Sequence, residues 1–150
     1  MITVRDSVEI KVTPEKAFAW LTNIRNKETY QAWHPDHVDL IWVKGEPWEE
    51  GSIMYCEEYL HGVLHKLKFK CTNKVKDKLI EYRPLFPLSL FAPGNAFIFE
   101  PKGENSCVFT ATGRLRGGPL LKKLGKKKLD ATMQHVKEEG ENIKRILESS

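Results

Sequence analysis

Residues 51–72, GSIMYCEEYLHGVLHKLKFKCT, are the stretch that decides the fold of this chain. Their pattern is typical of two β-strands joined by a tight turn at His61 and Gly62, where glycine supplies the positive φ that a two-residue hairpin loop needs. Counting outward from this turn pairs Glu58 with His65 across the two strands. The stretch therefore predicts a hairpin with a defined register.

Alternation along the two strands assigns the side chains to two faces. One predicted face carries Lys66, Lys68 and Lys70 and lies in water. The other face is apolar except for Glu58 and His65, which are close enough to interact. They form a buried ion pair or a pair at the sheet rim, or else they line a cavity and do chemistry there. The apolar residues predicted on this face are Met54, Cys56, Leu60, Val63, Leu67, Phe69 and Cys71.

Composition indicates one globular domain over residues 1–150. The chain is 41% hydrophobic and 29% charged, which is ordinary for a soluble protein and unlike a disordered or fibrous one. No apolar run approaches the roughly 20 residues of a membrane span, and no basic-then-apolar leader follows Met1. These features predict a cytoplasmic protein.

The cysteines and the basic residues narrow the functional classes. Cys56, Cys71 and Cys107 form no CxxC pair, which favours a reducing compartment. The net charge of +4 comes largely from the lysines of residues 119–130, PLLKKLGKKKLD. This run contains no interleaved aromatic residues, so we expect a solvated helix end and no nucleic-acid binding.

The order of the predicted elements begins with a strand over residues 2–12. Thr13 as N-cap and Pro14 at the first helical position then start a short amphipathic helix. A second short helix over residues 28–33 ends before Pro35, because proline disfavours the helical conformation in the preceding residue. Further strands are predicted at residues 38–44, 78–83, 95–101 and 106–116.

Residues 84–94, PLFPLSLFAPG, differ in kind from the strands around them. Three prolines among large apolar side chains exclude a regular helix or a central strand. Such a segment either covers the core or forms the mouth of a hydrophobic pocket, and we favour the mouth. The predicted ligand-cavity residues are Phe86, Leu88 and Phe91 of this segment with Leu67 and Phe69 of the hairpin.

From Pro119 onward the pattern becomes helical. An apolar stripe recurs at alternating spacings of four and three residues. One curved antiparallel sheet cannot cover its own apolar face, so the long helix must lie across it. The predicted fold class is therefore α+β, with Glu58 and His65 directed into the space between sheet and helix. The stripe consists of Leu129, Met133, Val136, Gly140, Ile143 and Leu147.

This order of elements, with the TPEKAF helix start at residues 13–18, resembles the START-related and polyketide-cyclase superfamily (SRPBCC, Bet v 1-like). Its members are the helix-grip proteins, whose curved antiparallel sheet wraps around a long C-terminal helix and a hydrophobic cavity. The resemblance covers essentially the whole chain. It implies two short helices after the first strand and a cavity for an apolar ligand, in a superfamily that ranges from lipid carriers to cyclases.

Three short pieces resemble a narrower family. They are WHPDH at residues 33–37, Glu57 and Glu58 ahead of the glycine turn, and HVKEE at residues 135–139. Together they are similar to the diacetylphloroglucinol and phloretin hydrolases, metal-dependent enzymes that cut a carbon–carbon bond between an acyl group and a phenolic ring. The resemblance implies a metal held by His34 or His37, by Glu58 in preference to Glu57, and by His135 and Glu139.

The residue types fit a metal without the resemblance. His135 and Glu139 are four positions apart, so they share one helix face and can present two ligands to one ion. Two imidazoles and two carboxylates suit zinc, or another divalent metal, with a position left for water or substrate. Glu58 and His65 are then the candidate catalytic residues, with His65 a second-shell partner, a general acid or base, or a replacement ligand.

Each piece also has a plain structural explanation. A histidine near a loop is usually only a loop residue, and a His-x-x-x-Glu pair on a charged helix is often solvated. Two functional hypotheses follow. One is a zinc-dependent hydrolase acting on an apolar, acylated aromatic substrate; the other is a metal-free carrier of a lipid or another apolar small molecule.

Overall fold

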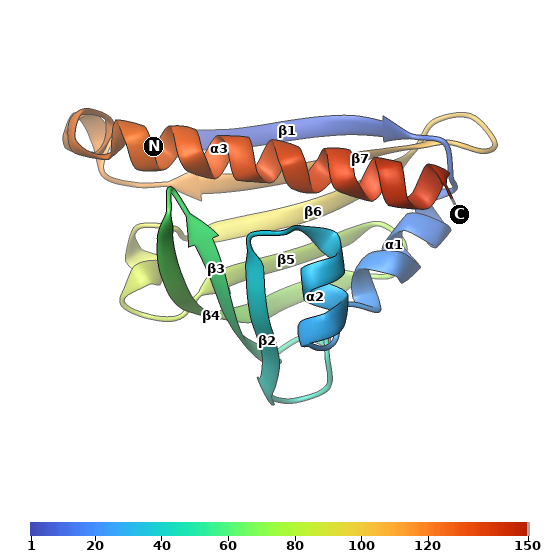
Figure 1. The fold of residues 1–150 in the computed structure, drawn as a ribbon, viewed down its shortest axis with the longest axis horizontal. Coiled ribbons are helices and arrows are strands. Elements are labelled where there is room, and N and C mark those ends of the chain that lie inside the picture. Colours follow the sequence, from blue (N-terminus) through green and yellow to red (C-terminus); the bar gives the residue numbers. More distant parts are fainter. Residues whose placement is uncertain (150) are drawn as a thin grey trace.

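The computed structural model describes residues 1–149, with the side chains of residues 1–117 and 125–149. A seven-stranded antiparallel sheet, in the order β1-β7-β6-β5-β4-β3-β2, curves around one long helix (Figure 1). This is the helix-grip arrangement predicted from the sequence. The strands are β1 (Ile2–Ile10), β2 (His37–Lys44), β3 (Ile53–Leu60), β4 (Val63–Val75), β5 (Leu79–Pro84), β6 (Gly94–Pro101) and β7 (Cys107–Leu115); the helices are α1 (Pro14–Thr22), α2 (Lys27–Trp33), η1 (Leu88–Leu90) and α3 (Gly118–Glu148).

The central hairpin has the predicted register. Glu58 pairs with His65 across β3 and β4, and the turn residues His61 and Gly62 have φ values of 55° and 73°. Two positive φ angles in a two-residue loop match the twist of the flanking strands. The lysine face is also confirmed, with Lys66 exposed to solvent.

The two short helices begin at side-chain caps. The Lys16 amide donates to Thr13 Oγ1 at 3.3 Å, as expected for the cap of α1. Asn26 and Thr29 form a reciprocal capping box at the start of α2, which the sequence analysis missed. The chain leaves α2 in an extended conformation before Pro35, so the residues after the helix turn toward the sheet interior.

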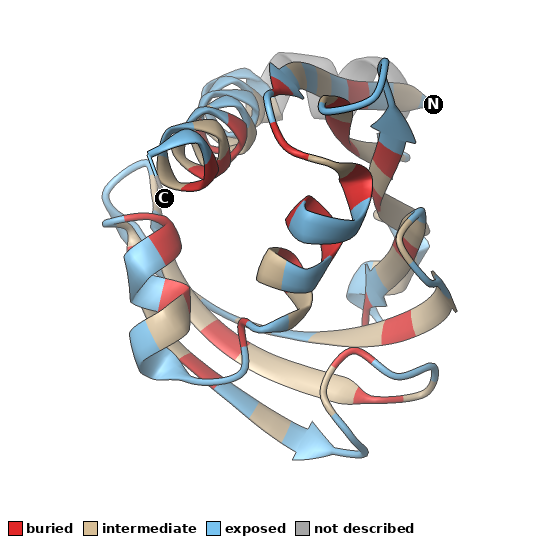
Figure 2. Cartoon of the chain, turned by 90° about the vertical axis from the view of Figure 1, so that its right-hand side faces the viewer, coloured by how far each residue is buried: buried red, intermediate tan, exposed pale blue. Residues whose placement is uncertain are grey.

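The core lies between the concave face of the sheet and α3. Figure 2 shows buried positions on the inward sides of the strands and helices. Ile143 and Leu147 are 1% and 4% exposed. Gly140 lies against β1, where an added Cβ would be 3.5 Å from Val8 Cγ1, so the missing side chain lets the helix approach the strand.

The predicted apolar stripe is wrong in the middle of α3. Met133 is 45% exposed, whereas Thr132, His135, Val136 and Glu139 line the space under the helix. A strict alternation of four and three residues drifts around a helix with 3.6 residues per turn, so the inward face shifts by about one position. Among residues 1–149, no helix is long and apolar enough to cross a membrane.

Truncating Ile143 to alanine should lower the free energy of unfolding by about 2–5 kcal/mol, because it removes a fully buried side chain from the contact between α3 and the sheet. The matched control is Met133→Ala on the same helix, with an expected change of about 0.5 kcal/mol or less. Urea denaturation measures both. Equal losses would contradict the docking of α3 described above.

Candidate metal centre

A cavity of about 240 Å³ lies between the sheet and α3. Its walls are mostly apolar and aromatic. Leu67 and Phe69 line it, as predicted, together with Tyr82 and Phe97 from the neighbouring strands. Glu58, His135 and Glu139 also line it and form a polar cluster with His37. The cavity therefore combines an apolar interior with one group of ionisable side chains.

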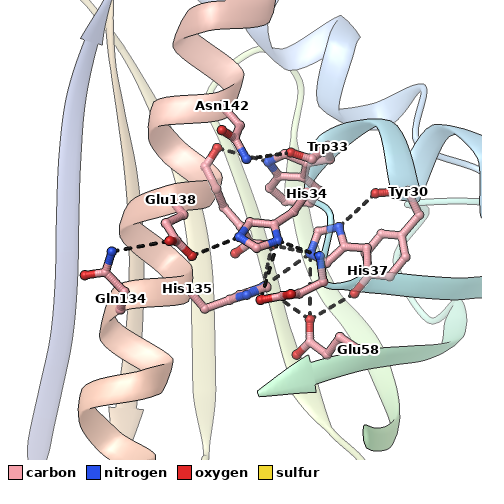
Figure 3. A network of polar contacts seen from close by, with 11 residues as sticks. Tyr30, Trp33, His34, His37, Glu58, Gln134, His135, Glu138 and Asn142 are labelled. Atoms are coloured by element: carbon pink, nitrogen blue, oxygen red, sulfur yellow. Dashed lines mark hydrogen bonds and ion pairs between the residues drawn. The ribbon is translucent and has the colours of Figure 1, made fainter. Parts of the chain in front are cut away.

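Four side chains from three elements converge at this cluster (Figure 3). His37 begins β2, Glu58 lies in β3, and His135 and Glu139 lie one turn apart on α3. His37 is fully buried, and the side chains of His135, Glu139 and Glu58 are 8%, 13% and 14% exposed. The helix spacing and the strand alternation thus bring these groups together as expected.

The distances between their polar atoms are short. His37 Nε2 lies 2.9 Å from Glu139 Oε2 and 3.3 Å from His135 Nε2. His135 Nε2 lies 3.4 Å from both Glu139 Oε2 and Glu58 Oε2. Ligands bound to one tetrahedral zinc at 2.0–2.1 Å stand about 3.3 Å apart. His37, His135 and Glu139 therefore have the spacing of a metal donor set, and Glu58 adjoins it.

The orientation of His37 is fixed by α2. Its Nδ1 lies 2.8 Å from the Tyr30 carbonyl oxygen, which can only accept, so Nδ1 carries the hydrogen and donates. The Tyr30 ring stacks on the imidazole at 3.8 Å with an interplanar angle of 4°. Nε2 is therefore left with its lone pair toward the cluster, the arrangement usual for metal-binding histidines.

His34 is held in a different way. The Asp36 amide donates to its Nδ1 at 2.9 Å, so the hydrogen lies on Nε2, which donates to Glu138 Oε1 at 3.0 Å. His34, Asp36 and His135 form a second compact group, but both ring nitrogens of His34 already have partners. Of the two histidines that the sequence left open, the geometry favours His37 as the ligand.

The ionisation of the cluster follows from its contacts. Burial alone lowers the pKa of His135, but hydrogen bonds and charge interactions with Glu139 and Glu58 outweigh it and raise the pKa to about 10. Burial alone raises the pKa of Glu139, but His135 and His37 lower it to about 2. Without an ion, the cluster therefore holds a proton on His135 between charged carboxylates.

One atom of the cluster is unsatisfied. Within the described residues, Nδ1 of His135 is buried and has no hydrogen-bond partner. Tyr30 also contributes, because its hydroxyl donates to Glu58 Oε2 at 3.1 Å. Polar atoms buried without a partner are rare in stable cores and are typical of sites kept for a function.

His65 does not join the cluster, so the expected contact with Glu58 is wrong. Glu58 contacts Tyr30, His37 and His135, and no ion pair between Glu58 and His65 exists in the described part of the chain. The pairing of β4 with β5 begins only at Phe69, so His65 lies on a projecting part of the hairpin and does not line the cavity.

The segment between β5 and β6 does not line the cavity either. Phe86, Leu88 and Phe91 are 75%, 47% and 58% exposed and lie outside it, which corrects the prediction of a cavity mouth. The reason is the backbone: the Leu85 amide donates to the Lys68 carbonyl and the Arg116 amide to the Phe91 carbonyl. These bonds hold the segment at the end of the sheet.

The sequence analysis missed several cavity residues. Tyr30 and Trp33 were separable as functional only by their spacing of three on α2, which places both on one face of the helix. Tyr82, Asn95 and Thr132 line the cavity as well and carried no local signal.

The comparisons with known proteins agree with this architecture. Residues 1–141 match the family model described as polyketide cyclase / dehydrase and lipid transport. The chain belongs to this family. A search of curated protein sequences gave no match.

Solved structures with the fold of this polyketide-cyclase family member include norcoclaurine synthase from Thalictrum flavum in complex with dopamine and hydroxybenzaldehyde. Its TM-score is 0.74 at 13% identity, with 99% of this chain and 87% of that chain covered. A START superfamily protein from Mycobacterium smegmatis has a TM-score of 0.65 at 16% identity, covering 94% and 98%. Ara h 8.0201 has a TM-score of 0.71 at 14% identity, covering 99% of each chain. At these identities the similarity establishes the fold.

The pKa of His135 predicts how the stability of metal-free protein depends on pH. Its raised pKa stabilises the folded state fully below about 6.5, and this contribution is lost as pH rises through about 10. The lowered pKa of Glu139 contributes above about 4.5 and is lost as pH falls toward 2. The two contributions are therefore both present between about pH 4.5 and 6.5.

The measurement is urea denaturation in excess chelator, from pH 6.5 to 10, of the wild type and the His135→Gln variant. The wild type should lose more stability over this range than the variant, because only the wild type carries the titrating imidazolium. Parallel profiles would contradict the ion cluster.

Proposed function

We propose that this protein binds a divalent metal ion, zinc in the first place, through His37, His135 and Glu139, with Glu58 as a fourth ligand or as a base. We further propose that the site hydrolyses an apolar, acylated aromatic substrate bound in the adjoining cavity. The observation that carries the proposal is the approach of His37 Nε2, His135 Nε2 and Glu139 Oε2 to within 2.9–3.4 Å of one another.

The donor set fits the ion chemically. Two imidazole nitrogens and one or two carboxylate oxygens match the ligands of catalytic zinc sites, which leave a position open. An ion would also compensate two carboxylates that are largely withdrawn from water, a placement that is costly for unpaired charges. A bound zinc ion would supply a Lewis acid for a substrate carbonyl and would lower the pKa of a water molecule.

The residues of the chain would perform the remaining tasks. The aromatic side chains of Phe69, Tyr82 and Phe97 form apolar walls that suit a ring and exclude water. Tyr30 holds His37 through its carbonyl and its stacked ring, and holds Glu58 through its hydroxyl. Glu58, the outermost of the four groups, is placed to accept a proton from water and pass it to the substrate.

The reaction is balanced as a hydrolysis. The hydroxyl of water adds to the carbonyl carbon, and the bond between that carbon and the ring breaks. The ring carbon takes the proton that Glu58 received. The products are a carboxylic acid and the ring without its acyl group.

A carrier function is the second candidate. The apolar walls of the cavity favour it, since such a space also suits a lipid or another apolar small molecule. The matched family includes lipid transport in its description, and the similar norcoclaurine synthase structure holds two small aromatic molecules. In this case the polar cluster would only anchor the polar end of the ligand.

Metal analysis of protein purified without a histidine tag separates the two candidates. The proposal predicts about one zinc per chain, and at least tenfold weaker zinc binding in Glu139→Gln and His37→Ala, because each removes a ligand. His65→Ala is the matched control, since it removes a histidine outside the cavity. Zinc binding should also weaken below about pH 6, where protons compete for imidazoles. Metal-free protein with co-purified lipid would favour the carrier.

The Glu58→Gln variant tests the hydrolytic step. If Glu58 is the base, the variant should keep its zinc while kcat on an acetylated phenol falls about 10²–10⁴-fold. Loss of zinc would identify Glu58 as a ligand instead. Acid release is followed by titration at constant pH. Zinc-loaded wild-type protein that cleaves no acylated phenol would contradict the proposed reaction and leave the metal site intact.

A further inference from the structure

The segment from Leu85 to Pro93 presents large apolar side chains to solvent. Phe86, Leu88, Leu90 and Phe91 are 75%, 47%, 51% and 58% exposed. They lie close together in sequence around the short helix η1, and none of them lines the cavity. An exposed cluster of this kind is unusual on a soluble monomer and is typical of an interaction surface.

Basic side chains surround this segment. The Leu85 amide donates to the carbonyl of Lys68, and the Phe91 carbonyl accepts from the amide of Arg116. Arg114 lies against Gly94, where an added Cβ would be 2.7 Å from its Nη2. The fully exposed basic residues of this end of the sheet and the adjoining part of α3 are Lys66, Lys68, Arg83, Arg114, Arg116, Lys126, Lys127 and Lys128.

Acidic residues are absent from the three stretches that supply this end. Residues 59–76, 82–99 and 105–129 contain no aspartate or glutamate. Figure 1 shows the β3–β4 turn, the segment between β5 and β6, and the start of α3 at the same end of the sheet. Distant parts of the sequence therefore combine into one surface that is apolar at its centre and positive around it.

We propose that this end of the molecule docks onto the surface of an anionic lipid bilayer. Phe86, Leu88, Leu90 and Phe91 would enter the boundary between headgroups and acyl chains, and the surrounding lysines and arginines would contact lipid phosphates. Apolar insertion combined with basic contacts is the combination by which proteins bind such surfaces without spanning them. This surface is separate from the metal cluster, so the inference does not depend on the proposed reaction.

The basic run on α3 alone gave no reason to expect a membrane, because it contains no aromatic residue. The fold supplies Phe86 and Phe91 from another part of the chain. Charge also decides between a bilayer and a second copy of the chain as the occupant. Two copies meeting through this surface would oppose their basic residues to one another, whereas an anionic bilayer complements them.

Vesicle co-sedimentation tests the inference on the full chain. The probes are phosphatidylcholine vesicles with and without about one third phosphatidylglycerol, at low salt and at about 0.5 M NaCl, where screening is strong. The double variant Phe86→Ser/Phe91→Ser removes the apolar centre. Its matched control is Ile41→Ser/Val43→Ser on β2, which replaces two side chains that are 49% and 51% exposed elsewhere.

The wild type and the control should bind the anionic vesicles equally. The Phe86→Ser/Phe91→Ser variant should bind at least tenfold more weakly, and high salt should weaken wild-type binding similarly. Because both phenylalanines are exposed, the melting temperature of the variant and its affinity for an apolar probe in the cavity should stay within error of the wild type.

Three results would overturn the inference. They are folded wild type that ignores anionic vesicles, a loop variant that binds as well as the wild type, and a wild-type dimer that the loop substitutions dissociate. The last result would assign the surface to contact between copies of the chain.

Discussion

The hydrogen bond from His37 to the carbonyl of Tyr30 is the interaction on which the site depends. It sets the ring so that Nε2 meets Glu139 and His135 of α3. Trp33 strengthens the same junction, because its indole donates to the Glu139 carbonyl. The end of α2 thus ties the long helix to the sheet margin, and the cavity lies beneath this junction. A rigid backbone acceptor and a stacked ring leave His37 little freedom to turn elsewhere.

The cluster is costly as a purely structural device. Nearly buried carboxylates and imidazoles lose hydration, and they regain it only through partners with good geometry. A proton on His135 supplies part of that compensation, and a divalent ion in the same place would supply more. The apolar walls beside the cluster raise the strength of every charge interaction within it. An apolar ligand in the cavity would therefore meet one reactive or anchoring end.

Sequence patterns predicted the parts of the fold that depend on local chemistry. The glycine turn set the hairpin register, and Thr13 with Pro14 set the start of α1. The site was predicted less completely, because backbone groups decide it. His34 and His37 are equivalent as letters, and only the Asp36 amide and the Tyr30 carbonyl distinguish them. The surface segment after β5 was misassigned for a similar reason: its hydrogen bonds to two other strands fix its direction, and no local pattern records them.

The central claim is that three or four side chains hold one ion. The most direct measurement is an anomalous-scattering map at the zinc edge, from crystals of untagged protein grown with zinc. We predict one strong peak about 2.0–2.2 Å from His37 Nε2, His135 Nε2 and Glu139 Oε2. A map without a peak in this cluster, or with its only peak beside His34 and Asp36, would contradict the account.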